Sequence, residues 1–377
     1  MANVSSSNGL EKRPKLRFPG FEKPWKVFTA EELFQNIVDK NHSDETVLTI
    51  VQGKGTLPRE QAGRNIHYDD ASLSNYKKVE PGDFIIHLRS FEGGLEMSNE
   101  AGIVSPAYTI LRCKKTHSSL FYDAYFHTDE FINHNLSKAV EGIRDGRQIS
   151  YAAFKWLGIP YCDPCEQKKI SDLLAVLNKR IAKQSDLVES LKKYKRGLVS
   201  DLFSKQKIGS WDEKTLAEIC SEFRSGKNIK SSEILPNGDY PVYGGNGVRG
   251  FTDHFSHDGE YIIVGRQGAL CGNVRIVNGK NYLSEHAIAV KANAENNTHF
   301  LLYLLSWMRL GQYSDQGAQP GLAVNKLLRL KCYIPDIETQ EKLVALLARL
   351  DCYIAGHENT LNKLSKQKHG LLQQLFI

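Results

Sequence analysis

The sequence predicts an α+β protein: two mixed α/β domains separated by two long helices that pack as an antiparallel coiled coil, in a pseudo-two-fold tandem repeat. Three observations predict this class. Apolar residues recur at alternating steps of four and three through two long stretches. The two stretches resemble each other. Each stretch follows a body in which short β-type runs alternate with turn residues.

Each long stretch carries one seam. In the first stretch the seam comprises Ile170, Leu174, Leu177, Ile181, Gln184, Val188, Leu191, Lys195, Leu198 and Leu202. In the second it comprises Leu343, Leu347, Leu350, Ile354, His357, Leu361, Leu364, Lys368, Leu371 and Leu375. Both seams are apolar except at two positions, which fall at the same steps in each copy. This shared interruption favours a duplicated element.

The two helical stretches also align residue by residue. At a constant offset of 173, from Gln167 to Phe203, 15 of 37 positions are identical. The identities include Gln167 with Gln340 and the terminal Leu-Phe of each copy. Each copy is entered through Ile-Pro, at 159–160 and 334–335.

A single seam needs a partner that buries it. A helix of about 40 residues is about 60 Å long, and the other copy is the simplest partner. The chain must return after the second body, so an antiparallel pair is expected. The alternative is that each helix packs on its own neighbouring domain or on a second chain.

The pattern divides the chain into five segments. They are a disordered N-terminus (1–14), a first domain (15–160), a central helix (161–206), a second domain (207–333) and a C-terminal helix (334–377). Within the domains, strands are expected at 47–51, 84–88, 108–111, 261–264 and 287–290, and helices at 121–136, 213–220 and 300–310. Short segments of the two domains are also similar in sequence, and they align Gly82 with Gly259 and Arg89 with Arg266.

Composition is that of a globular chain, with 41% hydrophobic residues among 377. No apolar run approaches the roughly 20 residues that span a bilayer, and the N-terminus lacks a signal-peptide core, so the cytoplasm is expected. Seven cysteines, an odd number, favour reduced thiols.

Residues 164–207 hold eleven Lys or Arg against five Asp or Glu. That bias is typical of a solvated helix face and also suits a surface beside a polyanion.

Motifs that would indicate catalysis, cofactor binding or a metal site are weak. Residues 245–250 fit GxGxxG, but the following FTDHFSHDG does not predict the helix that a dinucleotide fold needs, so a tight turn is expected instead. Cys162 and Cys165 have CxxC spacing without a second pair, and no metal site is expected. Asp336 and Glu338 suggest either a nuclease carboxylate cluster or an acidic N-cap. Walker A, HExxH and GxSxG sequences are absent, so no catalytic residue is assigned.

Several motifs occur together in the order of one known family. They are KLRFPGF followed by Trp25; the helix pair IP…EQKKI…LKKYKRGLVSDLF and IP…TQEKL…LSKQKHGLLQQLF; and, in the second body, YPVYGGNGVRGF, DGEYIIVGRQGALCGNV, SEHAI and GAQPGL. On these residues the chain resembles the specificity subunits of type I restriction-modification enzymes, over nearly its full length. It departs from that pattern at Thr339, where the family usually has Glu.

The resemblance implies a DNA-reading scaffold without catalysis. Two target-recognition domains would each read one half of a bipartite, asymmetric site in double-stranded DNA, and the paired helices would set the gap. Two modification (methyltransferase) subunits would dock on the helices and carry S-adenosylmethionine, and restriction subunits would use ATP and Mg²⁺; this chain would bind no cofactor. Because DNA advances about 34–36 Å per turn, a longer helix pair is expected to change the gap and not the half-sites.

Within the resemblance, six residues are candidate DNA contacts, because Arg can bind guanine bidentately and Asn or Gln adenine. They are Arg89 and Tyr108 in the first domain, and Asn246, Arg249, Arg266 and Gln267 in the second. Arg89 and Arg266, at expected strand ends, could instead form structural ion pairs. Two other functions remain open: a coiled-coil protein-interaction scaffold that does not bind DNA, and a complete nuclease or methylase.

Overall fold

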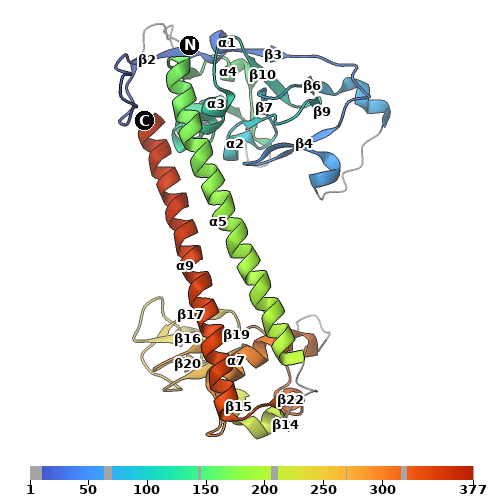
Figure 1. Ribbon diagram of the computed structural model, residues 1–377, viewed down its shortest axis with the longest axis vertical. Helices are drawn as coiled ribbons and strands as arrows, with labels where there is room; N and C mark the ends of the chain where they lie inside the picture. Colours follow the sequence, from blue (N-terminus) through green and yellow to red (C-terminus); the bar gives the residue numbers. More distant parts are fainter. Residues whose placement is uncertain are drawn as a thin grey trace. The chain divides into compact units, whose positions relative to one another are not determined.

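The chain forms two compact units, Met1–Gln184 with Thr360–Ile377, and Ser185–Asn359. The computed structural model describes residues 11–62, 70–142, 146–204, 211–268, 270–315 and 321–376. Two long helices, α5 (Pro164–Ser204) and α9 (Ile337–Phe376), each contribute residues to both units (Figure 1). The units therefore divide within the helices, whereas the five-segment division of the sequence keeps each helix whole.

The first unit is built on a four-stranded antiparallel sheet of order β3-β10-β7-β8. Its strands are β3 (Phe34–Ile37), β10 (Thr109–Cys113), β7 (Phe84–Ile86) and β8 (Glu96–Met97). Smaller sheets pair β1 (Glu11–Lys12), β2 (Trp25–Thr29) and β13 (Gly158–Tyr161); β4 (Leu48–Val51) and β5 (Gly55–Pro58); β6 (Lys77–Val79) and β9 (Gly102–Val104); and β11 (Val140–Glu141) and β12 (Gln148–Ile149). The α-helices are α1 (Ala30–Leu33), α2 (Ser90–Gly93), α3 (Ser119–Phe126) and α4 (Tyr151–Phe154).

The second unit has a sheet of the same connection order, β15-β21-β18-β19. Its strands are β15 (Cys220–Ser225), β21 (Ala287–Ala292), β18 (Tyr261–Gly265) and β19 (Val274–Val277). Smaller sheets pair β17 (Gly247–Thr252), β16 (Tyr240–Gly244) and β20 (Tyr282–Leu283), and β14 (Asp212–Thr215) with β22 (Lys331–Ile334). The α-helices are α6 (Leu216–Ile219), α7 (Thr298–Trp307) and α8 (Val324–Leu327).

The entrance to each sheet is duplicated in detail. Thr29 and Thr215 each begin a one-turn helix through a capping box, in which Glu32 or Glu218 returns a carboxylate to the threonine N–H. Each helix then runs directly into the first strand of its sheet. Before it, β2 pairs with β13 and β14 pairs with β22, the strand that precedes a long helix. The repeat that the two helices predict therefore extends through both mixed α/β domains.

A buried glutamine joins each long helix to the mixed α/β domain that precedes it in the chain. The Gln167 side chain accepts from the Ser118 N–H at 3.0 Å and donates to the Cys162 carbonyl at 3.0 Å. Gln340 makes the same pair of bonds, with the Asn297 N–H at 2.9 Å and the Pro335 carbonyl at 2.9 Å. The N–H groups that they satisfy precede α3 and α7. The identity of these glutamines thus has a structural cause.

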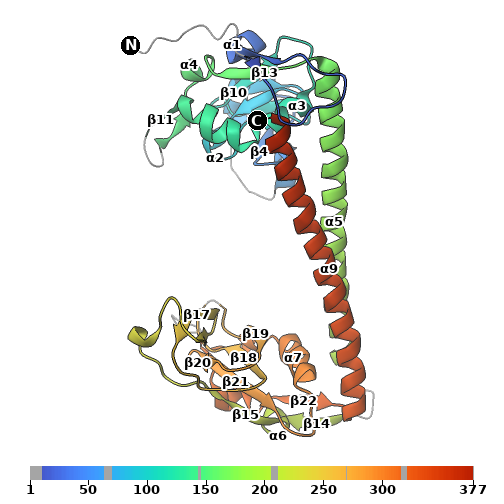
Figure 2. The same cartoon turned by 90° about the vertical axis from the view of Figure 1, so that its left-hand side faces the viewer.

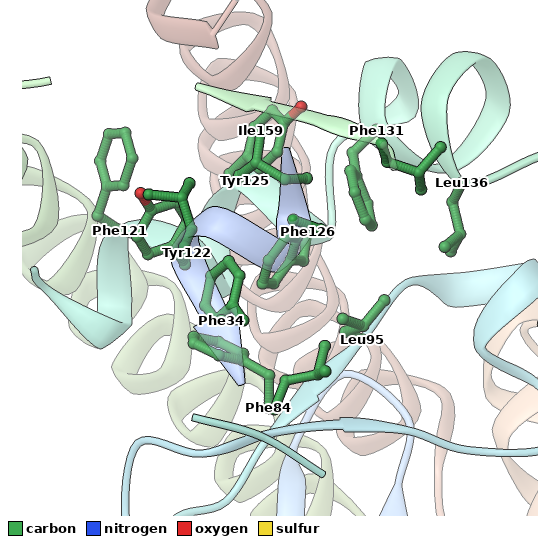
Figure 3. Close-up of a cluster of buried hydrophobic side chains, with 14 of the residues drawn as sticks. Phe34, Phe84, Leu95, Phe121, Tyr122, Tyr125, Phe126, Phe131, Leu136 and Ile159 are labelled. Carbon is green, nitrogen blue, oxygen red and sulfur yellow. The ribbon is translucent and has the colours of Figure 1, made fainter. Parts of the chain in front are cut away.

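The core of the first unit is aromatic. Figure 3 shows Phe34, Phe84 and Phe126 packed together beside Tyr122, and all four are fully buried. Phe376, at the end of α9, completes this cluster against Trp25, Phe121 and Tyr125. The last turn of the second long helix is therefore part of the first unit's core.

The second unit is completed in the same way by α5. Phe203 is 2% exposed and packs on Phe300 and Trp307 of α7, with ring centroids 5.6 Å away in both cases. Figure 2 shows α7 lying between the strands of this unit and the long helices. The repeated Leu-Phe is thus the anchor by which each long helix ends in a core.

The long helices pack against each other antiparallel. In the first unit, Ile170 and Leu174 near the start of α5 share a cluster with Leu375 near the end of α9. In the second unit, Lys195 of α5 forms an ion pair with Asp351 of α9. All the predicted seam residues are buried or half-buried. Burial raises the pKa of Asp123, and the charge of Lys368, the counterpart of Lys195, opposes that shift, so each shared lysine of the seams has a carboxylate near it.

Three expectations are corrected. Residues 1–10 lie outside the described residues, but Glu11–Lys12, expected to be disordered, pair with Lys26 and Trp25 because β2 offers a free edge. The helix expected at 213–220 is shorter: α6 spans only Leu216–Ile219, because Glu213–Thr215 belong to β14, which pairs with β22, and Cys220 begins β15. The helix expected at 121–136 is interrupted: α3 ends at Phe126, and a π-helix follows over Glu130–Asn135.

Candidate functional site

The glycine-rich stretch of the second unit is a β-hairpin. β16 and β17 pair from Tyr240 with Thr252 to Gly244 with Gly247, which leaves Gly245-Asn246 as the turn. Asn246 is exposed at this turn, and Arg249 is exposed on β17. A strand follows the turn, so the GxGxxG pattern does not open a helix and the dinucleotide alternative is wrong.

The hairpin turn lies against the ends of β18 and β21. A Cβ atom on Gly245 would stand 3.0 Å from the His286 carbonyl oxygen and 3.2 Å from that of Gln267. On Gly265 it would stand 2.6 Å from the Gly245 carbonyl oxygen. These glycines therefore allow the backbone to pack on itself, and the packing brings the turn beside the next two candidate residues.

Arg266 and Gln267 lie where β18 ends. The Arg266 N–H donates to the His286 carbonyl at 3.0 Å, and its Nη1 donates to the Glu285 carbonyl at 3.4 Å. The Gln267 Oε1 lies 2.8 Å from the His286 Nδ1. Within the described ranges Arg266 has no carboxylate partner, so the ion-pair alternative does not apply to it.

Sequence reasoning missed two residues of this surface. Arg275 of β19 lies beside the hairpin, because a Cβ on Gly247 would come within 2.7 Å of its Nη1. His286 was quoted only as part of the repeated SEHAI segment, and its ring is 41% exposed. Spacing in the sequence does not identify either residue as part of this surface. We call the following set the polar rim: Asn246, Arg249, Arg266, Gln267, Arg275 and His286.

The polar rim combines amide, imidazole and guanidinium groups on one surface. Amide groups can bond adenine through paired donor and acceptor atoms, and guanidinium groups can bond guanine or phosphate. No group of three His, Cys, Asp or Glu that could hold a metal ion occurs in the part of the chain that the structure describes. The chemistry available at the rim is therefore recognition by hydrogen bonds and positive charge.

The first unit places Arg89 and Tyr108 at the corresponding sheet end, with different geometry. Tyr108 is half-buried and lies edge-on to His87, with ring centroids 6.4 Å apart. Arg89 is exposed, and its N–H donates to His87 Nδ1 at 3.3 Å. Arg89 does not occupy the position in its sheet that Arg266 occupies, directly after the strand. The reason is that β7 ends at Ile86 and the chain then turns into α2.

A buried carboxylate lies under the first unit's surface. Glu96 is 1% exposed and accepts from the Gly53 N–H at 2.6 Å, the Gly55 N–H at 2.9 Å and His127 Nε2 at 3.2 Å. Burial alone would raise the pKa of Glu96, but these bonds and the charge of His127 lower it. Burial would lower the pKa of His127, yet Glu96 and Asp123 raise it. The result is a buried ion pair that holds the β4–β5 turn.

This pair predicts a pH dependence of the first unit's stability. His127 has a raised pKa in the fold, so its contribution is complete below the unfolded value of about 6.5 and is lost as pH rises through the folded value. The pKa of Glu96 is lowered, so its carboxylate stays charged as pH rises from there, and burial raises the pKa of Asp123. We expect the unfolding free energy measured in urea to fall as pH rises above about 6.5, and His127→Gln to flatten that profile.

The matched control is His299→Gln in the second unit, whose ring is 47% exposed beside Glu260. It should leave the pH profile as in the unmodified chain. An unchanged slope in His127→Gln would contradict the prediction.

The remaining sequence motifs have structural explanations. Asp336 accepts from the Thr339 N–H at 2.9 Å at the start of α9, so its carboxylate is an N-cap, and these bonds lower its pKa. Asp163 accepts from the Cys165 N–H at the start of α5. Burial raises the pKa of the Cys162 thiol, while Cys165 is exposed. Among the described helices, none is both long and apolar enough to cross a membrane.

Comparison with known proteins identifies similar chains. Residues 209–366 match the family described as type I restriction modification DNA specificity domain. The Escherichia coli type I restriction enzyme EcoprrI specificity subunit is 41% identical over 159 residues, which cover 41% of this chain and 38% of that protein. A putative type I specificity subunit of Mycoplasma genitalium is 26% identical over 247 residues, 61% of this chain and 64% of the relative. The chain thus aligns with less than two thirds of either relative.

Solved structures extend the likeness to the whole chain. The S subunit of a type I restriction-modification system from M. genitalium superposes with a TM-score of 0.60 at 20% identity, covering 97% of this chain and 99% of that one. A chain from a study of complex assembly and conformational transition of the type I R-M system gives a TM-score of 0.63 at 15% identity, covering 94% and 98%. At these identities the structures establish the shared fold.

Proposed function

We propose that the chain is the sequence-specific DNA-binding subunit of a type I restriction-modification complex, because residues 209–366 match the family described as type I restriction modification DNA specificity domain. The observation that carries the proposal is the polar rim. All six of its residues lie within the matched stretch, and they gather side chains that suit base edges and phosphates on one surface.

The second part of the proposal is that the site is bipartite and asymmetric. Two units with the same strand order would each read one half of a site in double-stranded DNA. The first presents Arg89, Tyr108 and His87, and the second presents the polar rim, so the two half-sites would differ. The lengths of α5 and α9 would set the gap between them.

The third part concerns the partners. Two modification subunits would dock on the chain and methylate adenine with S-adenosylmethionine, and restriction subunits would cut with ATP and Mg²⁺. This chain would contribute no catalytic residue and no cofactor, and it would act in the cytoplasm. A complete nuclease or methylase would instead show activity in the purified chain alone.

Selection from a random duplex library with the full chain tests the proposal. One split sequence should be enriched, and its binding should fall steeply with salt, because phosphate contacts release counterions. Equal retention of all duplexes, or no retention, would favour the alternative of a coiled-coil protein-interaction scaffold without DNA binding.

Arg249 is the residue of the rim at which base reading is tested most directly, since it is exposed on β17 and no ion pair of it is found among the described residues. We expect Arg249→Ala to relax preference at one position of the half-site by about 1–3 kcal/mol. The measurement is the ratio of Kd values for the selected duplex and its single-base variants. Arg329→Ala, an exposed arginine of the same unit, is the control. A uniform loss for all duplexes would assign Arg249 to phosphate instead.

A further inference from the structure

The second unit contains a large cavity that the function proposed above does not use. It has a volume of about 860 Å³ and is lined by residues of α5, β19, α7 and α9. Figure 2 shows α7 beside the long helices in this unit, and β19 next to α7. Its wall includes Tyr303 and Trp307, and three arginines line it: Arg196, Arg275 and Arg309. We call this site the arginine pocket.

The two acidic groups of the arginine pocket are already neutralised. Lys192 Nζ lies 2.5 Å from Glu358, and Lys195 forms an ion pair with Asp351. Asp351 also accepts from the Tyr303 hydroxyl at 2.7 Å. Burial and Asp351 raise the pKa of that hydroxyl, so it stays a donor.

The three arginines are left as an excess of positive charge. Five Lys or Arg line the pocket against two Asp or Glu, and five minus two leaves three. Over the residues that the structure describes, Arg196, Arg275 and Arg309 have no ion pair. A concave site with guanidinium donors and no free carboxylate suits a bound anion.

The arginine pocket is continuous with the polar rim. Arg275 belongs to both, since it lines the pocket and its Nη1 lies beside Gly247 of the hairpin. Arg309 directly follows Met308 at the end of α7, in a left-handed conformation with φ 46° and ψ 60°. Trp307 stacks on Phe203 at 5.6 Å, so its ring belongs to the packed wall.

We propose that the arginine pocket binds the sugar–phosphate backbone of the duplex whose bases the polar rim reads. The inference rests on the proposed function and assigns a second role within it: the other five residues of the rim discriminate sequences, while Arg196, Arg275 and Arg309 hold phosphates without regard to sequence. The shared residue Arg275 marks the boundary between the two surfaces. The excess positive charge of the pocket, and the continuity of the pocket with the hairpin, favour a polyanion over a small neutral ligand.

The test uses the full chain with Arg196→Gln, Arg275→Gln and Arg309→Gln, singly and combined. Kd is measured against salt concentration for the selected split duplex and for a random duplex. Each substitution should lower the slope of log Kd against log salt by about 0.9, because one phosphate contact is lost. Binding to both duplexes should weaken by the same factor. The corresponding Arg→Lys variants should keep most of the slope, since phosphate accepts a point charge.

Arg329→Gln is the matched control, because Arg329 is exposed in the same unit and lines a different hollow. It makes the same charge change and should leave the slope unchanged. Thermal midpoints of all variants should match that of the unmodified chain, and the single variants keep the test valid if the combined one unfolds.

The outcomes separate the two claims. If the unmodified chain binds the split duplex with a steep salt slope, but the three variants behave like Arg329→Gln, the pocket assignment is overturned and the proposed function stands. Loss of sequence preference at constant slope would overturn it too, in favour of base reading. If the unmodified chain binds no duplex, the proposed function fails first and the inference with it.

Discussion

Phe376→Ala is expected to destabilise the first unit by about 3–5 kcal/mol, the usual cost of truncating a buried phenylalanine. The ring is fully buried at the end of α9 and contacts Trp25, Phe121 and Tyr125, with centroids 5.2–6.1 Å away. The truncation would leave a cavity between these rings and would loosen the last turn of the helix. Urea unfolding gives the free energy, and amide hydrogen exchange assigns the loss to the first unit.

The duplication supplies a matched experiment. Phe203→Ala removes the equivalent ring from the core of the second unit, so faster exchange should appear there instead. Leu346→Ala, on α9 with a side chain 47% exposed, is the control and should cost no more than about 0.5 kcal/mol. If Phe376→Ala behaved like Leu346→Ala, the end of α9 would not belong to the first unit's core.

Glu166→Ala should have a comparable effect, about 3–5 kcal/mol, because it breaks a buried ion pair by removing one partner. Glu166 is 1% exposed and accepts two bonds from Arg17, at 2.9 and 2.7 Å, and one from the Trp25 indole at 3.0 Å. Burial of Glu166 is tolerated only because all three donors converge on it. Without the carboxylate, the buried indole N–H and the Nε and Nη2 groups of a guanidinium that is 15% exposed would lose this acceptor, while the bond from Arg17 Nη1 to the Lys23 carbonyl would remain.

The second copy shows what happens without this carboxylate. Thr339 occupies the equivalent position in α9, and its side chain and N–H bond to Asp336 at the helix start, the one side-chain partner of Thr339 found among the described residues. Thr339→Ala should therefore cost less than about 1 kcal/mol. Unfolding in urea compares the two variants, and a double variant Glu166→Ala with Arg17→Ala should recover part of the loss, because no charge is then left unpaired. Equal costs for Glu166→Ala and Thr339→Ala would refute this explanation.

The departure at Thr339 also has a physical reason. Glu166 is needed where the segment containing Arg17 crosses the start of α5, and Leu16 of the same segment donates to the Gln374 carbonyl of α9 at 3.0 Å. The resemblance to the family identified the departure, but the contact that explains the role of Glu166 joins residues 149 positions apart.

The candidate site was predictable only in part. Exposed Asn246 and Arg249 follow from a glycine-rich turn between strands, which is a local signal. Arg275 and His286 come from two other strands and meet the hairpin only because Gly245 and Gly247 allow the backbones to approach closely. The arginine pocket likewise draws its residues from four elements. Long-range juxtapositions of this kind leave no periodic pattern.

The sequence by itself determined the two long helices, their seams, their duplication and the α+β class, because helical periodicity and capping act within a few residues. Only the tertiary structure decided that the repeated Leu-Phe enters a core, that the paired glutamines bond the N–H groups that precede α3 and α7, and that the helix expected at 213–220 is shortened to Leu216–Ile219. Those outcomes depend on burial and on hydrogen bonds between distant segments. Their free energy exists only once the segments have been brought together.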